Sequence, residues 1–521
     1  MSVKRRNFAD HQTSWEKNPA SSSASVHSSA LHRTSADMKS GSDDSMELKP
    51  LMSQRNSLDM DNEGGDDEGK DLTYQYIVLG VLFATFASNQ WARQAIYYLC
   101  DFSDSGNPVK HINVALDFNK EQYATLASFG FTIVFALVSF FAGTISDNCN
   151  RSTILSLSCL VWSACTALQG QATSYDNLIP LRASIGASQA FFNPASYTIL
   201  SDIFPQKMIG TVNGIFSGGV YLGGALASLS ILLDNQVGWQ NTMKVIGGIG
   251  IIAAILCFGI VREPREDIKK MDIEIRELDT MESNGSRADK TQSTTAVKST
   301  GSFLADVVTA VQEVTETYEA KLLFAGIGLR FCAGFSIGIW KAPFIFSKFP
   351  GIDTAFASSN AAIVAGGGLA STLLGGYLSD RLTNTKPGVK PRARMWVPAI
   401  GSLLAAPLWA LFILSSDPKI TAIALLCEYL VAECWFGPTL AALFSAVPAN
   451  RKGTAQGLFS VLTALGNTAP VLIGALSGGA LGSYSLDNVL LYSTSGCYIA
   501  CGILFAMAAM ENERRMSTAT R

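Results

Sequence analysis

The chain has few charged residues and almost no histidine. Lys, Arg, Asp and Glu make up 16% of its 521 residues, against roughly 25% in an average soluble domain. Of its four histidines, only His111 lies beyond residue 32, and its ten cysteines show no metal-binding or disulfide spacing. No nucleophile or metal constellation appears, so we predict no enzyme, no metal site and no cofactor. We also expect no nucleic-acid partner.

The first 30 residues lack the apolar run of a signal peptide. Residues 1–72 are rich in Ser and acidic side chains, which predicts a disordered tail. The rest of the chain is dominated by apolar stretches long enough to cross about 30 Å of hydrocarbon. They predict helices near residues 74–99, 121–146, 153–171, 176–202, 209–233, 241–261, 320–346, 356–379, 395–415, 420–446, 454–477 and 489–510.

Two matched blocks of sequence recur in the same order. Phe192-Asn-Pro194 and Gly210-Thr-Val-Asn-Gly214 are answered by Phe436-Gly-Pro438 and Gly453-Thr-Ala-Gln-Gly457. Such self-similarity indicates two structurally equivalent halves. We therefore predict an all-α polytopic membrane protein with twelve transmembrane helices in two six-helix, pseudo-symmetric bundles. Duplicated membrane bundles of this kind are typical of secondary transporters, whose substrate site lies where the repeats meet.

The predicted organisation has five parts. They are a tail (1–72), an N-terminal bundle (73–261), a linker with an amphipathic helix (262–319), a C-terminal bundle (320–510) and a short tail (511–521). Lys and Arg gather in the loops on one side of the predicted membrane, among them Arg151, Lys207, Arg381, Arg394 and Arg451. By the positive-inside rule this side, with both termini and the linker, is predicted to be cytosolic.

Six ionisable residues are predicted to lie deep in the membrane. They are Arg93, Arg182, Arg330, Lys341, Glu428 and Glu433. They fall on the first and fourth helices of each half, so we interpret them as lining one shared cavity, with Gln189 and Trp435 beside them. Charges at this depth are costly and mark functional sites. Four cations against two carboxylates favour an anionic substrate. Glu428 and Glu433 are either structural counter-charges or proton-coupling residues.

A further motif carries a family resemblance. Gly143-Thr-Ile-Ser-Asp147-Asn-Cys-Asn-Arg151 resembles the signature between helices 2 and 3 of the major facilitator superfamily, and Gly376-Tyr-Leu-Ser-Asp380-Arg381 its second-half copy. The resemblance covers residues 74–510 and implies the major facilitator fold. It implies that Gly143, Asp147, Arg151 and Asp202, with Gly376, Asp380 and Arg381, form a conformational latch. Asn148 stands where the family usually has a basic residue.

Within that superfamily the chain looks most like the spinster group. Arg93, Arg182, the Val261-Arg-Glu-Pro264 segment and Glu428 through Trp435 carry this likeness. It implies a transporter of an anionic or amphiphilic solute, such as a lysophospholipid or sphingolipid-type molecule, with proton coupling. Ala92 and Gln189 replace acidic residues that are candidate proton carriers in the group.

Two alternatives stay open at this point. One is a carrier, symporter or uniporter, for a small organic anion such as a carboxylate or sugar acid. The other is a non-transporting receptor built on the same scaffold.

The prediction of which cellular membrane contains the protein depends on one short motif. Glu47, Leu51 and Met52 have the spacing of an adaptor-binding signal in the predicted cytosolic tail. Adaptor binding there would indicate an endolysosomal membrane, and the plasma membrane is the other candidate.

Overall fold

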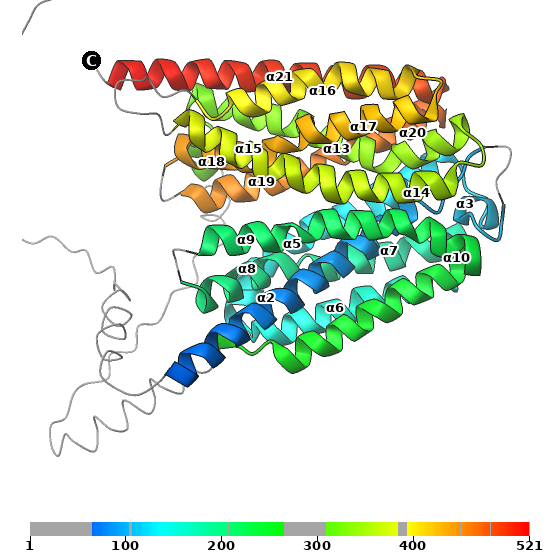
Figure 1. Ribbon diagram of the computed structural model, residues 1–521, viewed down its shortest axis with the longest axis horizontal. Coiled ribbons are helices and arrows are strands. Elements are labelled where there is room, and N and C mark those ends of the chain that lie inside the picture. The colour runs from blue at the N-terminus through cyan, green and yellow to red at the C-terminus, as the bar shows by residue number, and fades with distance from the viewer. Residues whose placement is uncertain are drawn as a thin grey trace, which may run out of the picture. The chain divides into compact units, whose positions relative to one another are not determined.

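The computed structural model describes residues 65–103, 107–205, 208–264, 309–383, 393–448, 451–479 and 481–519. The Glu47, Leu51 and Met52 motif lies outside these residues. From Asp66 on, the described residues form one compact unit, which is almost entirely helical (Figure 1).

The first half contains α2 (Gly65–Gln94), η1 (Ala95–Tyr97), α3 (Ile112–Ala115), α4 (Lys120–Ala124), η2 (Thr125–Phe129), α5 (Gly130–Asn148), α6 (Arg151–Gln169), α7 (Tyr175–Gln189), α8 (Phe192–Ile203), α9 (Ile209–Ser217) and α10 (Gly219–Ile260). The second half contains α13 (Tyr318–Lys348), α14 (Asp353–Ala362), η3 (Ile363–Gly367), α15 (Gly368–Thr383), α16 (Trp396–Leu414), α17 (Pro418–Ala432), η4 (Glu433–Trp435), α18 (Phe436–Ala446), α19 (Lys452–Gly466), α20 (Thr468–Leu476), β1 (Ser477–Gly479), β2 (Gly482–Ser483) and α21 (Leu486–Ala519).

Nine helical runs in the described residues are long and apolar enough to cross a membrane. The run Thr211–Ile260 is 50 residues long, and Gly238 interrupts it with a φ of +79°. Only glycine adopts such a left-handed conformation readily, so the chain turns back there. With that run counted as two crossings, and with α2 and the α7–α8 pair added, the fold is consistent with twelve crossings. The chain is an all-α, multi-pass membrane protein.

Equivalent helices of the two halves are interrupted at equivalent places. The second crossing of each half contains a π-helical turn, η2 in one and η3 in the other. The fourth crossing breaks between α7 and α8 in the first half and at η4 in the second. Each break lies just before a proline, Pro194 or Pro438, because proline has no N–H and clashes with the preceding turn. The repeated sequence blocks therefore correspond to repeated helix geometry.

Two helices extend beyond the predicted bundle boundaries. Helix α2 begins at Gly65 rather than near residue 73, and α21 continues to Ala519 rather than ending near residue 510. Hydropathy marks only the part of a helix inside the hydrocarbon, so it missed these polar ends.

The start of α2 and the end of α21 lie at the same end of the bundles (Figure 1), as an even number of crossings requires. We call this end the terminal side and the opposite end the far side. The charge bias of the loops predicts that the terminal side is cytosolic.

Candidate functional site

Arg182 is fully buried in the first half and binds backbone rather than carboxylates. Its guanidinium donates to the carbonyl oxygens of Arg93 (3.1 Å), Leu126 (3.3 Å) and Ala127 (3.5 Å). Leu126 and Ala127 belong to the π-helical turn η2. Arg182 therefore ties α7 to the end of α2 and to this turn, which is a positioning role.

Arg93 lies between aromatic rings from both halves. Its guanidinium carbon is 4.4 Å from the centre of the Phe131 ring on α5 and 5.7 Å from that of Phe335 on α13. Cations are attracted to the faces of aromatic rings. Within the described part of the chain Arg93 forms no ion pair, and its side chain is only partly buried.

Arg330 is paired with Glu433 in the second half. It donates to a carboxylate oxygen of Glu433 (3.0 Å) and to the carbonyl oxygen of Ala432 (2.9 Å), while its Nε is buried without a partner. The Glu433 side chain is 25% exposed. Tyr221 of the first half donates to the other Glu433 oxygen (3.5 Å). Glu433 thus lies at the contact between the halves.

The other two deep charges are almost completely buried, at 1% exposure each. Lys341 donates to the Tyr429 hydroxyl (2.8 Å), and Glu428 accepts a hydrogen bond from the Tyr498 hydroxyl. The second oxygen of Glu428 is buried without a hydrogen-bond partner. Neither residue forms an ion pair among the described residues.

Gln189 and Trp435 line the two helix breaks. Gln189, at the end of α7, donates to the carbonyl oxygen of Asn89 (3.1 Å). Trp435, in η4, packs edge-on against Phe331 and lies 5.2 Å from the Arg330 guanidinium carbon. Gln189 is the last residue of α7, and Glu433 directly follows α17. Each lies five residues before the proline of its helix break, Pro194 or Pro438, so the two occupy equivalent positions in the two halves.

The predicted site residues therefore form two groups rather than one uniform cavity. Arg93, Arg182 and Gln189 belong to a first-half group without an acidic side chain. Arg330, Lys341, Glu428, Glu433 and Trp435 form a second-half group in which both carboxylates lie. Arg93 reaches across to the second half through Phe335.

The hydrogen bonds between the halves lie from the middle of the bundles to the far side. Ser128 donates to the Asn467 carbonyl oxygen, Tyr123 to the Ile339 carbonyl oxygen (2.7 Å), and Asn360 to Tyr98 and Ser228. Tyr221, in the middle, also bonds Thr372 (2.6 Å). These bonds join the halves on the far side, which we therefore call the closed side.

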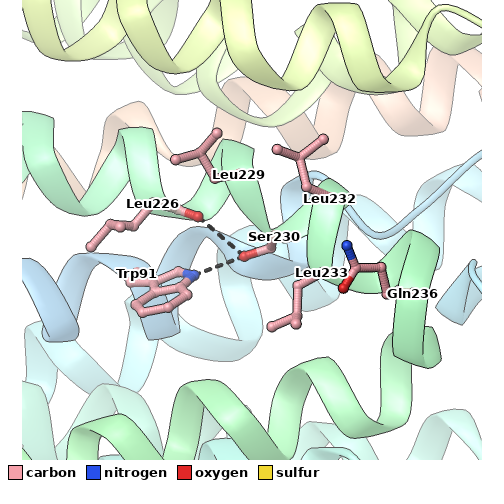
Figure 2. A pocket seen from close by; sticks show the side chains of 7 residues that line it. All are labelled: Trp91, Leu226, Leu229, Ser230, Leu232, Leu233 and Gln236. Carbon is pink, nitrogen blue, oxygen red and sulfur yellow. Dashed lines mark hydrogen bonds between the residues drawn. The ribbon is translucent and has the colours of Figure 1, made fainter.

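A cavity of about 290 Å³ lies beside Trp91. Figure 2 shows it bordered by leucines of α10, with Ser230 accepting a hydrogen bond from the Trp91 indole (2.7 Å). None of the predicted site residues lines this cavity. Its lining carries no charge, so it is no anion site.

Arg151 is fully buried and forms an ion-pair network on the terminal side. It pairs with Asp202 at the end of α8 (2.8 Å) and forms a bidentate pair with Glu263, just beyond α10. The Arg151–Asp202 pair was expected from the family motif. Glu263 was not assigned a role, although it stands in the Val261-Arg-Glu-Pro264 segment that carried the spinster likeness.

The rest of the latch is only partly described. Gly143 and Asp147 lie on α5, and their side chains are outside the described set. In the second-half copy, Asp380 pairs with Arg394 (3.3 Å) at a largely exposed position. Gly376 faces open space, and Arg381 is exposed. Arg151 of the first copy is therefore buried, whereas Asp380 and Arg381 of the second copy are exposed.

The comparison with known proteins agrees with this architecture. The family model "Major Facilitator Superfamily" matches residues 94–470. The chain belongs to this superfamily, which makes it a membrane transporter and not an enzyme.

Three similar proteins illustrate the match. The chain is 26% identical over 432 residues to a "Probable galactarate/D-glucarate transporter" of Bacillus subtilis, covering 80% of this chain and 88% of the relative. It is 25% identical to a protein of the same description from Escherichia coli K12, covering 85% and 95%. The inward-facing structure of a bacterial homologue of the human lysosomal transporter spinster superposes with a TM-score of 0.61, at 19% identity over 86% of this chain and 96% of that one. At that identity the superposition establishes the fold.

Proposed function

We propose that the protein carries small organic anions, such as sugar acids, by alternating access, and that Arg93 binds a substrate carboxylate. The observation that carries this proposal is the position and exposure of the Arg93 guanidinium. Its guanidinium lies between the two halves, is partly exposed and has no carboxylate partner among the described residues. A substrate carboxylate supplies the missing counter-charge, and arginine binds carboxylates in a bidentate manner.

The other deep cations suit this role less well. Arg182 is committed to three backbone carbonyl oxygens, and Arg330 is already paired with Glu433. Arg330 still has one buried, unpartnered N–H. When a substrate with a second carboxylate binds, it competes with Glu433 for Arg330. A diacid therefore fits the two groups of charges, one in each half, better than a monoacid.

The relatives support the same class of substrate. Two of them are described as galactarate/D-glucarate transporters, and these molecules are sugar diacids. The lysophospholipid or sphingolipid-type substrate, our first expectation, rests on the spinster likeness alone. The small organic anion, given first as the alternative, is now the better-supported reading.

The transport cycle and its coupling complete the proposal. With the terminal side cytosolic, closure of the far side corresponds to an inward-facing state. Glu433 and Glu428 are the proposed proton-coupling residues, since Ala92 and Gln189 leave the first-half group of site residues without an acidic side chain. Glu433 has the better position, because it contacts Arg330 and, through Tyr221, the opposite half.

A flux experiment with the purified full-length protein in liposomes tests the proposal. Uptake of radiolabelled galactarate and D-glucarate is compared with uptake of galactose, a neutral sugar, and of a lysophospholipid. We expect saturable uptake of the diacids and none of galactose. Saturable uptake of the lysophospholipid and of no diacid would contradict the proposal and indicate a lipid transporter.

The assignment of Arg93 has its own control. Arg93→Ala should reduce diacid uptake by about tenfold to a hundredfold, the usual range for a hydrogen bond to a charged group. Lys244→Ala removes a cation whose only hydrogen bond among the described residues is a 3.5 Å bond to Asn241, and it should leave uptake unchanged. Equal effects of the two substitutions would contradict the assignment.

A further inference from the structure

Lys341 is a buried cation beneath the closed far side, and it forms no ion pair among the described residues. Its side chain is 1% exposed, and its ammonium contacts one hydroxyl oxygen and two aromatic rings. The rings belong to Tyr429, 4.9 Å away, and to Tyr98, 5.9 Å away. An ammonium has three N–H donors, and only one acceptor is present here. Glu428 and Glu433 act on this charge electrostatically and offset part of the cost of its burial. Neither forms an ion pair with Lys341 within the described part of the chain, so a fixed structural role leaves two of its N–H donors unexplained.

Tyr98 connects this lysine to the closed side. It comes from the first half, directly after η1, while Lys341 and Tyr429 belong to the second half. The Tyr98 hydroxyl accepts a hydrogen bond from Asn360 (3.2 Å), whose amide also donates to Ser228 (2.9 Å). Ser228 in turn donates to the Ala357 carbonyl oxygen (3.0 Å). The residue that covers Lys341 is therefore also part of the far-side closure.

Separation of the halves on the far side must break these bonds. Tyr98 and Ser228 move with the first half, whereas Asn360, Ala357 and Lys341 move with the second. The same movement takes the Tyr98 ring off Lys341 and admits water to the ammonium. An ammonium that is buried when the far side is closed and exposed to water when it is open can attract an anion only in the far-side-open state.

We infer that Lys341 is an anion-binding residue of the far-side-open state, and that Tyr98 couples its exposure to the opening of the far side. The ligand is the carboxylate of the entering substrate, so this inference deepens the proposed function and rests on it. Lys341 attracts the anion when the far side is open. Closure then covers the lysine and leaves the anion to Arg93.

Accessibility tests the coupling without any substrate. A cysteine at position 341, made by Lys341→Cys, is treated from the far side with a membrane-impermeant, cationic methanethiosulfonate. Asn360→Ala removes the two hydrogen bonds that the Asn360 amide donates to Tyr98 and Ser228. Labelling of the cysteine should then rise by at least about tenfold, a change worth at least about 1.4 kcal/mol. Tyr98→Phe, which loses only the hydroxyl, should raise it less. Unchanged labelling in both backgrounds would overturn the coupling.

Two controls define the background of this measurement. The parent chain, with its ten natural cysteines, gives the labelling to be subtracted. The second control is Lys348→Cys. Lys348 is a partly exposed residue of the same helix, α13, and lies nearer the far side. It should be labelled equally with and without Asn360→Ala.

The anion-binding role is tested by the sidedness of KM. Lys341→Gln should raise the KM for a diacid presented on the far side by about tenfold to a hundredfold and leave the KM on the terminal side unchanged. Lys341→Arg should restore most of the loss. An equal rise on both sides, or none on either, would overturn the role. If the wild-type protein transports no organic anion, the proposed function fails, while the labelling experiment still decides the coupling.

Discussion

The Arg151–Glu263 pair of the first half is buried, whereas the Arg394–Asp380 pair of the second half is exposed. This difference predicts that the two pairs contribute unequally to stability. Arg151 and Glu263 have side-chain exposures of 0% and 4%, and they form a bidentate pair. Removing one partner of a buried pair costs about 3 to 5 kcal/mol, because the other charge stays buried without its partner. Arg151 retains Asp202 (2.8 Å), so we expect Glu263→Gln to cost about 3 kcal/mol, the lower end of that range.

The second half supplies the matched control. Arg394 and Asp380 have side-chain exposures of 32% and 61% at 3.3 Å, and exposed pairs contribute 0 to about 1 kcal/mol. Asp380→Asn should therefore leave stability almost unchanged. With about 2 to 4 °C per kcal/mol for a bundle of this size, Glu263→Gln should lower the melting temperature by about 6 to 12 °C.

Thermal unfolding of the purified protein in detergent measures the difference. All variants are heated at one scan rate, because unfolding of such proteins is often irreversible. A double-mutant cycle with Arg151→Gln isolates the pairwise energy. Equal melting temperatures for Glu263→Gln and Asp380→Asn would refute the argument from burial.

Three other predictions concern the cycle, coupling and location. Asp147→Ala should increase labelling of a terminal-side cysteine, since the family motif implies that this residue helps to close that side; unchanged labelling would count against the implied latch. Glu433→Gln should preserve substrate exchange but abolish the pH dependence of net transport, and wild-type transport that is itself independent of pH would leave Glu433 as a counter-charge to Arg330. Replacing Leu51 and Met52 together by alanine should move a fluorescently tagged protein to the plasma membrane, whereas an unaltered location would remove the sequence evidence for adaptor binding.

Much of the fold could be predicted because its causes are local in the sequence. Apolar runs mark the crossings, and Pro194 and Pro438 mark the equivalent breaks of the fourth crossings. The burial of Arg182, Arg330, Lys341 and Glu428 also followed from their position in apolar helices. The polar extensions of α2 and α21 were not predicted, since hydropathy does not register helix outside the hydrocarbon.

The partners of the buried charges could not be predicted in the same way. Glu263 is 112 residues from Arg151, and nothing in its local sequence identifies that partner. Arg182 binds carbonyl oxygens of the turn η2. No sequence motif predicts a π-helical turn there, so these partners could not be predicted. The sequence therefore indicated some of the buried charges but not Arg151 or Glu263. The structure separated Arg182 and Arg330, whose guanidinium groups have protein partners, from Arg93, which forms no ion pair among the described residues.

Equilibrium binding to the purified wild-type protein tests the central claim most directly. Isothermal titration with a sugar diacid is performed on the wild type, Arg93→Ala and Arg93→Lys, with the corresponding neutral sugar as control ligand. The account predicts that the wild type binds the diacid but not the neutral sugar. It also predicts that Arg93→Ala weakens binding by about tenfold to a hundredfold and that Arg93→Lys recovers part of the loss. Equal affinity of the wild type and Arg93→Ala for the diacid would contradict it.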